Sequence, residues 1–194
     1  MARTPSTMLP IGTPAPPFSL PDTEGHQVSL EDFHGHAGLI VAFISNHCPF
    51  VIHLKDALTS FAQDYEGRIP LVAIASNDVG SHPQDGPEHM AEDKRIHGYP
   101  FPYLFDETQA VAKAYEAACT PDFYLFDGDF KLVYRGQFDS SRPGNNVAVT
   151  GDDLRRATDA LLSGAVIPED QHTPSLGCNI KWKPGQEPDY FSRG

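Results

Sequence analysis

The chain has 194 residues, 40% of them hydrophobic, which suits a single domain with a buried core and excludes a disordered composition. Its formal net charge of −12 argues against binding to nucleic acid or to an anionic membrane, because both need a basic surface. No apolar run approaches the ~18 residues that span a bilayer. Residues 1–12 also lack the apolar core of a secretory signal, so we expect a cytoplasmic protein.

The N-terminal third predicts a β-ribbon that leads into a buried strand. Residues 1–16 are rich in proline, which predicts a loose arm. The stretch "PPFSLPDTEGHQVSLEDF" (16–33) predicts two short strands around a turn at "DTEGH", followed by a turn of helix over 30–33. The run "GLIVAFI" (38–44) is continuously apolar and rich in β-branched residues, which is typical of a strand buried on both faces.

A helix and a second buried strand come next. One helix face running to about residue 66 is indicated by apolar residues at spacings of 3, 4, 3 and 4, namely Val51, Leu54, Leu58, Phe61 and Tyr65. The run "IPLVAIA" (69–75) is the second strand. A strand–helix–strand order predicts two parallel strands joined by a right-handed crossover.

The second half predicts further elements and a long tail. In chain order they are a loop over 76–86, a helix over 87–97 with Pro87 first, a short strand over 101–105, a helix over 107–117, a hairpin over 122–136 that turns at Gly128-Asp129, a loop over 138–151, and a helix over 152–163 capped by Thr150 and ended by Gly164. Residues 165–194 are proline-rich and lack periodicity, and we expect the tail around Trp182 to fold back as a cover. The order predicts an α/β fold with a mixed central sheet flanked by helices.

Cys48 stands where the first buried strand meets the helix. Pro49 favours the first helical position, which places Cys48 at or next to the N-cap. Free backbone N–H groups and the helix dipole favour thiolate over thiol at such a position, and a protonated His47 would act in the same direction. The alternative is a buried cysteine that serves as a small apolar filler. However, the carboxyl end of a buried strand is where open α/β sheets place their chemistry.

Four stretches, in this order and spacing, carry a resemblance to a known family. They are "PAPPFSLPDTEGHQVSLEDF", "GLIVAFISNHCPFV", "LVAIASND" and "CTPDFYLFDGDFKLVYRGQFD". Together they resemble the thioredoxin superfamily, and within it the peroxiredoxin-like proteins related to alkyl hydroperoxide reductase and thiol-specific antioxidant. The resemblance implies a thioredoxin-like domain over 9–164, an N-terminal arm over 1–8, and a C-terminal extension over 165–194 that packs on the domain.

The resemblance also implies a set of site residues around Cys48. In this fold a cis-proline loop faces the active cysteine; Thr120 and Pro121 match its position, so we expect a cis bond between them. Ser45 matches the serine or threonine that precedes the peroxiredoxin cysteine by three residues. Three family features are absent, because Val41 replaces the peroxiredoxin proline, Val51 replaces the second thioredoxin cysteine, and no arginine falls beside the cis-proline. Arg142, in the loop after the hairpin, is the candidate substitute for that arginine.

A sulfenic acid or mixed disulfide on Cys48 needs a second thiol to resolve it. Cys119 is our first choice, because the cis-proline loop packs against the start of the Cys48 helix in this fold. Cys178 is the rival, either within the chain or across a homodimer, and an outside thiol such as glutathione is the third option. The alternative for these thiols is a small buried side chain that packs and does not react.

We therefore expect a thiol-dependent redox enzyme that reduces peroxides or disulfides, with electrons from a thioredoxin- or glutathione-type donor. We expect no organic cofactor, and no metal because the nine histidines show no H-x-x-x-H spacing and the cysteines no C-x-x-C spacing. The alternative is a non-catalytic thioredoxin-fold module for binding or redox sensing that keeps one oxidisable thiol. The absent proline, arginine and second cysteine favour that alternative.

Overall fold

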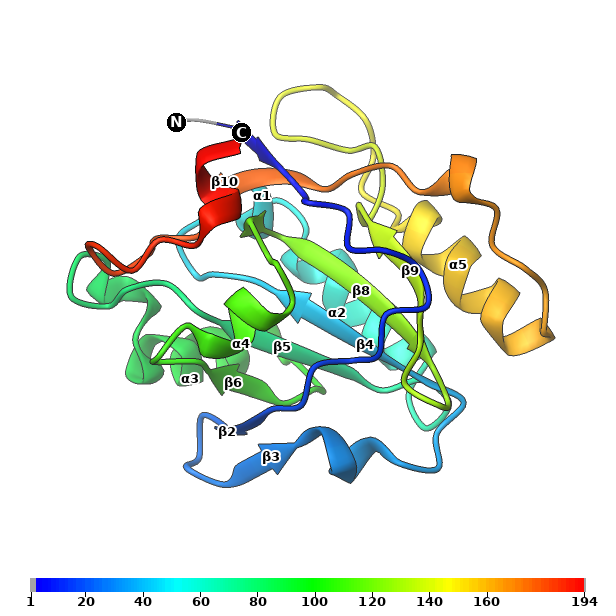
Figure 1. The fold of residues 1–194 in the computed structure, drawn as a ribbon, viewed down its shortest axis with the longest axis horizontal. Coiled ribbons are helices and arrows are strands. Elements are labelled where there is room, and N and C mark those ends of the chain that lie inside the picture. The colour runs from blue at the N-terminus through cyan, green and yellow to red at the C-terminus, as the bar shows by residue number, and fades with distance from the viewer. Residues whose placement is uncertain (1–2, 194) are drawn as a thin grey trace.

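A computed structural model describes residues 3–193 as a central five-stranded sheet covered on both faces (Figure 1). The strands in spatial order are β6 Tyr103–Phe105, β5 Leu71–Ala75, β4 Gly38–Phe43, β8 Asp122–Asp127 and β9 Leu132–Gly136. Strands β4, β5 and β6 are mutually parallel, whereas β8 runs antiparallel to both β4 and β9. The predicted mixed sheet, the parallel pair and the hairpin are thus confirmed.

Alternating side chains of β4 pack into two hydrophobic cores, one on each face of the sheet. Ile40 and Ala42 point into the core that also contains residues of α2 and α5, while Leu39 and Val41 point into the core covered by α4 and the N-terminal hairpin. The helices and 3-10 turns are α1 Pro49–Ile52, α2 Lys55–Asp64, α3 Pro87–His97, α4 Ala110–Ala114, α5 Asp152–Ser163, η1 Leu30–Phe33, η2 Pro83–Asp85, η3 Glu169–Gln171 and η4 Asp189–Arg193. The hairpin consists of β2 Ser19–Pro21 and β3 Gln27–Ser29. Within the part of the chain that is described, no helix is both long and apolar enough to cross a lipid bilayer.

The single helix predicted from residue 51 to about 66 is two helices. Leu54 takes φ −112° and ψ 0°, outside the usual helical values, so α1 ends before it and α2 begins after it. The predicted apolar face is nevertheless buried, with Leu58 and Phe61 both fully enclosed. The apolar spacing thus predicted correctly which side chains are buried, but it did not predict the break between α1 and α2.

The start of α5 also differs from the expectation. The N-cap is Gly151, with φ +72°, and not Thr150. The N–H groups of Thr150 and Gly151 both donate to the Asp139 carboxylate, at 2.8 and 2.7 Å. A carboxylate from the preceding loop therefore holds the two residues before α5, while the Thr150 hydroxyl accepts the N–H of Asp152, the first helical residue, at 3.4 Å.

The two ends of the chain pair with each other. A second, three-stranded antiparallel sheet has the order β1 Arg3–Pro5, β10 Leu176–Asn179 and β7 Cys119–Thr120. Figure 1 shows the segment after α5 running along the edge of the molecule and over the end of the sheet where α1 begins. The loose arm predicted over 1–16 is wrong, because β1 is hydrogen-bonded and Leu9 is buried. The expected cover by Trp182 is confirmed, since its side chain is 7% exposed.

Candidate functional site around Cys48

Cys48 is the N-cap residue of α1, in the loop that leaves the carboxyl end of β4. Its carbonyl oxygen accepts the N–H groups of Val51 and Ile52, both at 2.9 Å, and its side chain makes no capping hydrogen bond. The thiol instead donates to the carbonyl oxygen of Thr120 at 3.1 Å, and the residue is fully buried. The predicted N-cap position is confirmed, but the expected contact between sulfur and helix N–H groups is absent.

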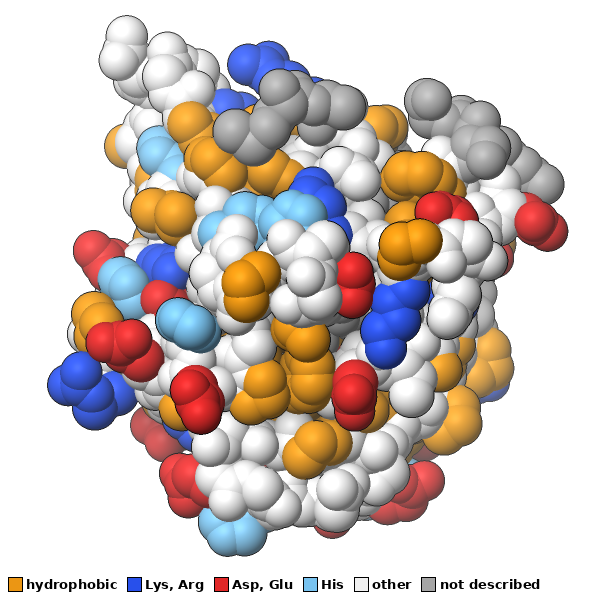
Figure 2. Space-filling model, turned by 90° about the vertical axis from the view of Figure 1, so that its left-hand side faces the viewer, with side chains coloured by type: hydrophobic (Ala, Val, Ile, Leu, Met, Phe, Trp, Pro, Cys, Tyr) orange, Lys and Arg blue, Asp and Glu red, His pale blue; other side chains and the backbone are white. Residues whose placement is uncertain are grey.

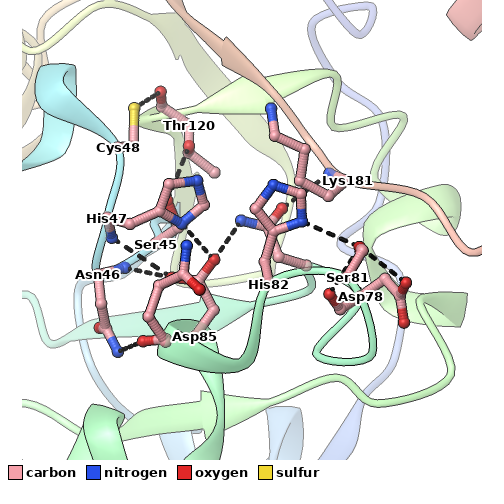
Figure 3. Close-up of polar contacts among 12 residues, drawn as sticks. Ser45, Asn46, His47, Cys48, Asp78, Ser81, His82, Asp85, Thr120 and Lys181 are labelled. Atoms are coloured by element: carbon pink, nitrogen blue, oxygen red, sulfur yellow. Dashed lines mark hydrogen bonds and ion pairs between the residues drawn. The ribbon is translucent and has the colours of Figure 1, made fainter.

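Thr120 links the Cys48 loop to the cis-proline loop. Its hydroxyl lies 3.3 Å from that of Ser45, while its carbonyl oxygen accepts the Cys48 thiol (Figure 3). The peptide bond between Thr120 and Pro121 is cis, which confirms the expectation. Ser45, Cys48, Thr120 and Pro121 are thus brought together by β4 and β7, two segments that are distant in the sequence.

Cys178 reaches the same place from the C-terminal strand. In the antiparallel ladder it stands opposite Thr120, and its side chain hydrogen-bonds Cys48. Burial, this hydrogen bond and the negative charge of a Cys48 thiolate together raise the pKa of the Cys178 thiol to about 12. The Cys178 thiol therefore keeps its proton at neutral pH.

Cys119 is fully buried in different surroundings. Its sulfur lies 3.7 Å from the carbonyl oxygen of Pro121, and burial, followed by the charge of Asp122, raises the pKa of its thiol well above the ordinary value. Burial also raises the pKa of Asp122 to about 6, although Ser6 and Tyr124 donate hydrogen bonds to its carboxylate at 2.7 and 3.0 Å. A carboxyl that titrates near neutrality therefore lies behind the cis-proline.

The loop before Cys48 is held by a buried carboxylate that sequence reasoning missed. Asp85 accepts the Asn46 N–H at 2.8 Å, the His47 Nδ1–H at 2.6 Å and the Asn77 side-chain amide at 2.8 Å (Figure 3). Burial alone would raise the pKa of Asp85, but these hydrogen bonds hold it below its usual value. The His47 ring stacks on that of His82, with 5.0 Å between centroids.

Arg142 lies on the other side of the cis-proline. Its guanidinium donates to the carbonyl oxygens of Asp139 and Ser141 at 2.6 and 2.7 Å, and burial lowers its pKa. It lines a small pocket of about 20 Å³ together with Phe50 and Pro121. The arginine is therefore fixed beside the cis-proline, and its hydrogen bonds go to its own loop.

Histidine side chains gather on the side of the molecule that carries α3 (Figure 2). A pocket of about 220 Å³ opens there and is lined by His47 and His89 among others. No group of three or more His, Cys, Asp or Glu side chains within residues 3–193 is arranged to hold a metal ion. A larger cavity of about 540 Å³ lies at the chain ends, where Arg3, Glu116 and Tyr190 line it.

Residues 11–135 match the protein-family model described as the AhpC/TSA family. The chain belongs to the AhpC/TSA family. A similar protein among curated sequences is "Putative peroxiredoxin Rv2521" of Mycobacterium tuberculosis, 30% identical over 114 residues, which are 59% of this chain and 68% of that protein. The family confirms the resemblance seen in the sequence, and the chain is a peroxiredoxin-like protein of the thioredoxin superfamily.

Solved structures extend the likeness beyond the family segment. An uncharacterised conserved protein from Geobacillus kaustophilus superposes with a TM-score of 0.92 at 53% identity, over 95% of this chain and 98% of that one. A hypothetical protein from Sinorhizobium meliloti 1021 gives 0.92 at 50% identity, over 94% and 100%. Peroxidoxin BcpB from Mycobacterium tuberculosis, at 16% identity, gives 0.60 over 79% of this chain and 96% of that one, and so supports the thioredoxin-like fold alone.

Most site residues predicted for this AhpC/TSA protein lie together, and the structure adds Asp85 and Asp122 to them. Asp85 falls in a stretch that we read only as a loop, although it follows the carboxyl end of a parallel strand, where α/β sheets place functional groups. Asp122, next to the cis-proline, was read as the start of a hairpin strand. The roles assigned to Cys48, Cys119, Ser45, Pro121 and Arg142 remain predictions.

Proposed function

We propose that this AhpC/TSA protein is a thiol-dependent reductase of peroxides or disulfides in which Cys48 is the nucleophile. The observation that carries the proposal is the placement of Cys48, at the start of α1 beyond the carboxyl end of β4 and against the cis-proline loop. That end of the sheet is where this class of fold positions reactive groups. Family membership supports thiol redox chemistry as the reaction class.

The chemistry balances with thiols alone. A Cys48 thiolate attacks one oxygen of a peroxide, the O–O bond breaks, and the sulfur becomes a sulfenic acid while the second oxygen leaves as an alcohol or water. With a disulfide substrate, the same thiolate forms a mixed disulfide and releases a thiolate. A second thiol then displaces water or the remaining thiol, and a thioredoxin- or glutathione-type donor restores both cysteines. A reducing compartment such as the cytoplasm would supply that donor.

The neighbouring residues would position the sulfur and the incoming group. Ser45 holds the Thr120 side chain, and Thr120 in turn fixes the Cys48 thiol through its carbonyl oxygen. His47, held by Asp85, presents its other ring nitrogen as a proton carrier. Arg142 would meet a peroxide that enters beside Pro121, because it lines that pocket. The positions of these side chains relative to Cys48 and Pro121 are what supports these roles.

A second candidate function is a redox-sensing module. One observation favours it, because Cys48 is 0% exposed beneath the C-terminal segment, whereas a fast peroxidase needs an accessible sulfur. The cysteine of a sensor needs to be oxidised only once per signal, so slow access of the oxidant to a buried sulfur is tolerated. The two functions differ in turnover.

Steady-state turnover tests the proposal. Purified protein is supplied with hydrogen peroxide, cumene hydroperoxide or a disulfide, and NADPH consumption is followed with thioredoxin and its reductase or with glutathione and its reductase. We expect wild-type turnover, and a loss of about 100-fold or more in Cys48→Ser, because the serine hydroxyl is un-ionised at neutral pH. A Glu66→Gln protein, changed at an exposed residue far from the site, is the control.

Several results would count against an enzyme. Turnover that survives in Cys48→Ser excludes Cys48 as the nucleophile. Wild-type protein that oxidises stoichiometrically at Cys48 but never cycles with either donor identifies the sensing module. Protein whose Cys48 is oxidised neither by excess peroxide nor by excess disulfide has neither function.

A further inference from the structure

The C-terminal strand β10 is pressed against the loop that contacts Cys48. Cys178 stands opposite Thr120 in the ladder, and the Thr120 carbonyl oxygen is the acceptor for the Cys48 thiol. A Cβ on Gly177 would lie 2.0 Å from that same oxygen, so a glycine is needed for β10 to come this close. The Cys178 side chain hydrogen-bonds Cys48 directly. The fold therefore holds these two thiols in contact.

Cys119 belongs to the opposite face of the small sheet. Adjacent residues of a strand point to opposite sides, so Cys119 and Thr120 diverge, and Cys178 shares the side of its partner Thr120. The buried core that contains Cys48 also contains Cys178. The Cys119 sulfur instead neighbours the Pro121 carbonyl oxygen and Asp122. Of the two candidate partners for Cys48, the contacts favour Cys178.

We propose that Cys178 is the resolving thiol of this protein and closes a disulfide with Cys48 inside one chain. This proposal rests on the proposed function, since it needs Cys48 to be oxidised first. The Cys178 thiol attacks the sulfenic sulfur of Cys48, the S–O bond breaks, and the hydroxyl leaves as water with the thiol proton. An external dithiol of the thioredoxin type then reduces the disulfide and is itself oxidised. No cysteine of a second subunit is required.

The protonation states of the two thiols fit this order of steps. Burial and the contact with Cys48 keep Cys178 protonated, so it donates a hydrogen bond to a Cys48 thiolate. Such a donor stabilises the thiolate, which the N–H groups of Val51 and Ile52 do not reach because they bond to the Cys48 carbonyl oxygen. Once Cys48 is a sulfenic acid its negative charge is gone, and Cys178 becomes easier to deprotonate.

Disulfide mapping tests the proposal on the wild-type chain. Reduced protein receives one equivalent of hydrogen peroxide, is quenched with N-ethylmaleimide and is digested with trypsin. Trypsin places the three cysteines on separate peptides, 4–55, 114–131 and 157–181, so each pairing has its own mass. We expect 4–55 joined to 157–181, in protein that migrates as a monomer on a non-reducing gel.

Two variants sharpen the result. Cys178→Ser should still form the Cys48 sulfenic acid, trapped by dimedone, while its turnover with thioredoxin falls by about tenfold or more, because resolution must wait for an outside thiol. Cys178→Ala repeats the test without a buried hydroxyl, and circular dichroism with thermal melting shows that both variants are folded. In Cys119→Ser we expect the disulfide between Cys48 and Cys178 to form as before.

The failures are separable. A mapped pair of Cys48 with Cys119, an intermolecular disulfide, or unchanged turnover in Cys178→Ser overturns Cys178 as the resolving thiol and leaves Cys48 as the nucleophile. If Cys48 is never oxidised in any of the proteins, the proposed function itself fails and this proposal fails with it.

Discussion

Cys48 takes its chemical surroundings from residues that are distant in the sequence. The N–H groups of Val51 and Ile52 bond to its backbone oxygen, its thiol donates to the Thr120 carbonyl oxygen, and the Cys178 side chain hydrogen-bonds it. In a buried site such individual hydrogen bonds decide the protonation state, because no water replaces a missing donor. The side-chain contacts of this sulfur therefore come from β7 and β10, and not from the helix that it begins.

Asp85 is the residue that we expect to matter most for the shape of the Cys48 loop. Its two carboxylate oxygens accept from Asn46 on one side and from His47 and Asn77 on the other. An asparagine has only one acceptor oxygen, so Asp85→Asn turns an amide group towards a donor. We expect the free energy of unfolding at pH 7 to fall by about 2–3 kcal/mol, the range for buried hydrogen bonds to a charged group.

The loss of stability in Asp85→Asn should become smaller as the pH falls. The pKa of Asp85 lies below its ordinary value of 3.8, so its contribution to stability is present above pH 3.8 and is lost as the pH falls through the lowered pKa. Urea titrations at pH 7 and pH 3 should therefore show a smaller difference between wild type and Asp85→Asn at the acid pH. Glu66→Gln, which changes an exposed carboxyl, is the control. An equal cost at both pH values would show that folding does not lower the pKa of Asp85.

At the scale of elements, the close approach of β10 to β7 depends on Gly177. Gly177→Ala places a Cβ 2.0 Å from the Thr120 carbonyl oxygen, so β10 must move away and Cys178 moves with it. We expect a loss of about 1–3 kcal/mol in stability, as for other overpacked sites. The rate at which peroxide-treated protein forms its internal disulfide should fall as well, and quenched mass spectrometry measures that rate.

A glycine elsewhere on the same segment supplies the control. Gly185 has φ +73° and open space around its Cα, so Gly185→Ala brings backbone strain of about 1 kcal/mol and no collision with β7. It should lower stability without slowing disulfide formation. If both variants form the disulfide at the wild-type rate, the position of β10 does not govern the pairing of the cysteines.

Elements whose contacts are local were predictable, and elements that need a distant partner were not. The apolar run 38–44 and the spacing of Leu58 and Phe61 each report burial directly, and both lie where the sequence places them. Strands β1, β7 and β10 have no such pattern, because each is short and is defined by hydrogen bonds to the others. The sequence predicted the position of Cys48 from the local pattern of strand, cysteine and proline, whereas the cis bond before Pro121 was expected from the family resemblance.

Choosing between Cys119 and Cys178 required the register of a ladder that joins the C-terminal segment to the middle of the chain. The expectation for Cys119 used proximity to Pro121, which the structure also has. The sequence did not show to which side of the strand the Cys119 side chain points. A strand of two residues sends neighbouring side chains to opposite faces, so a shift of one position exchanges the contact with Cys48 for a contact with Asp122.

At the scale of the whole molecule, both chain ends are hydrogen-bonded to each other near Cys48. Ser6 and Ser175 exchange backbone and side-chain hydrogen bonds at 2.9 and 3.0 Å, and Ser6 also donates to the buried Asp122 carboxylate. Because Cys48 is covered by the segment that this cluster anchors, access of a substrate depends on how firmly the ends are held. Asp122 therefore connects global stability to the site.

Asp122 should make the stability of the whole fold depend on pH near neutrality. Its pKa is raised from 3.8 to about 6, so the folded state binds a proton that the unfolded chain has already released. The stabilisation is complete below pH 3.8 and is lost as the pH rises through about 6. A rise of about two units corresponds to about 3 kcal/mol across that window. In Asp122→Asn the neutral amide removes this dependence, so its stability relative to wild type should increase by about that amount between pH 4 and pH 7.

Glu66→Gln, which changes an exposed carboxyl, should follow the wild-type profile in the same urea titrations. Parallel profiles for wild type and Asp122→Asn from pH 4 to pH 7 would show that folding does not raise the pKa of this carboxyl.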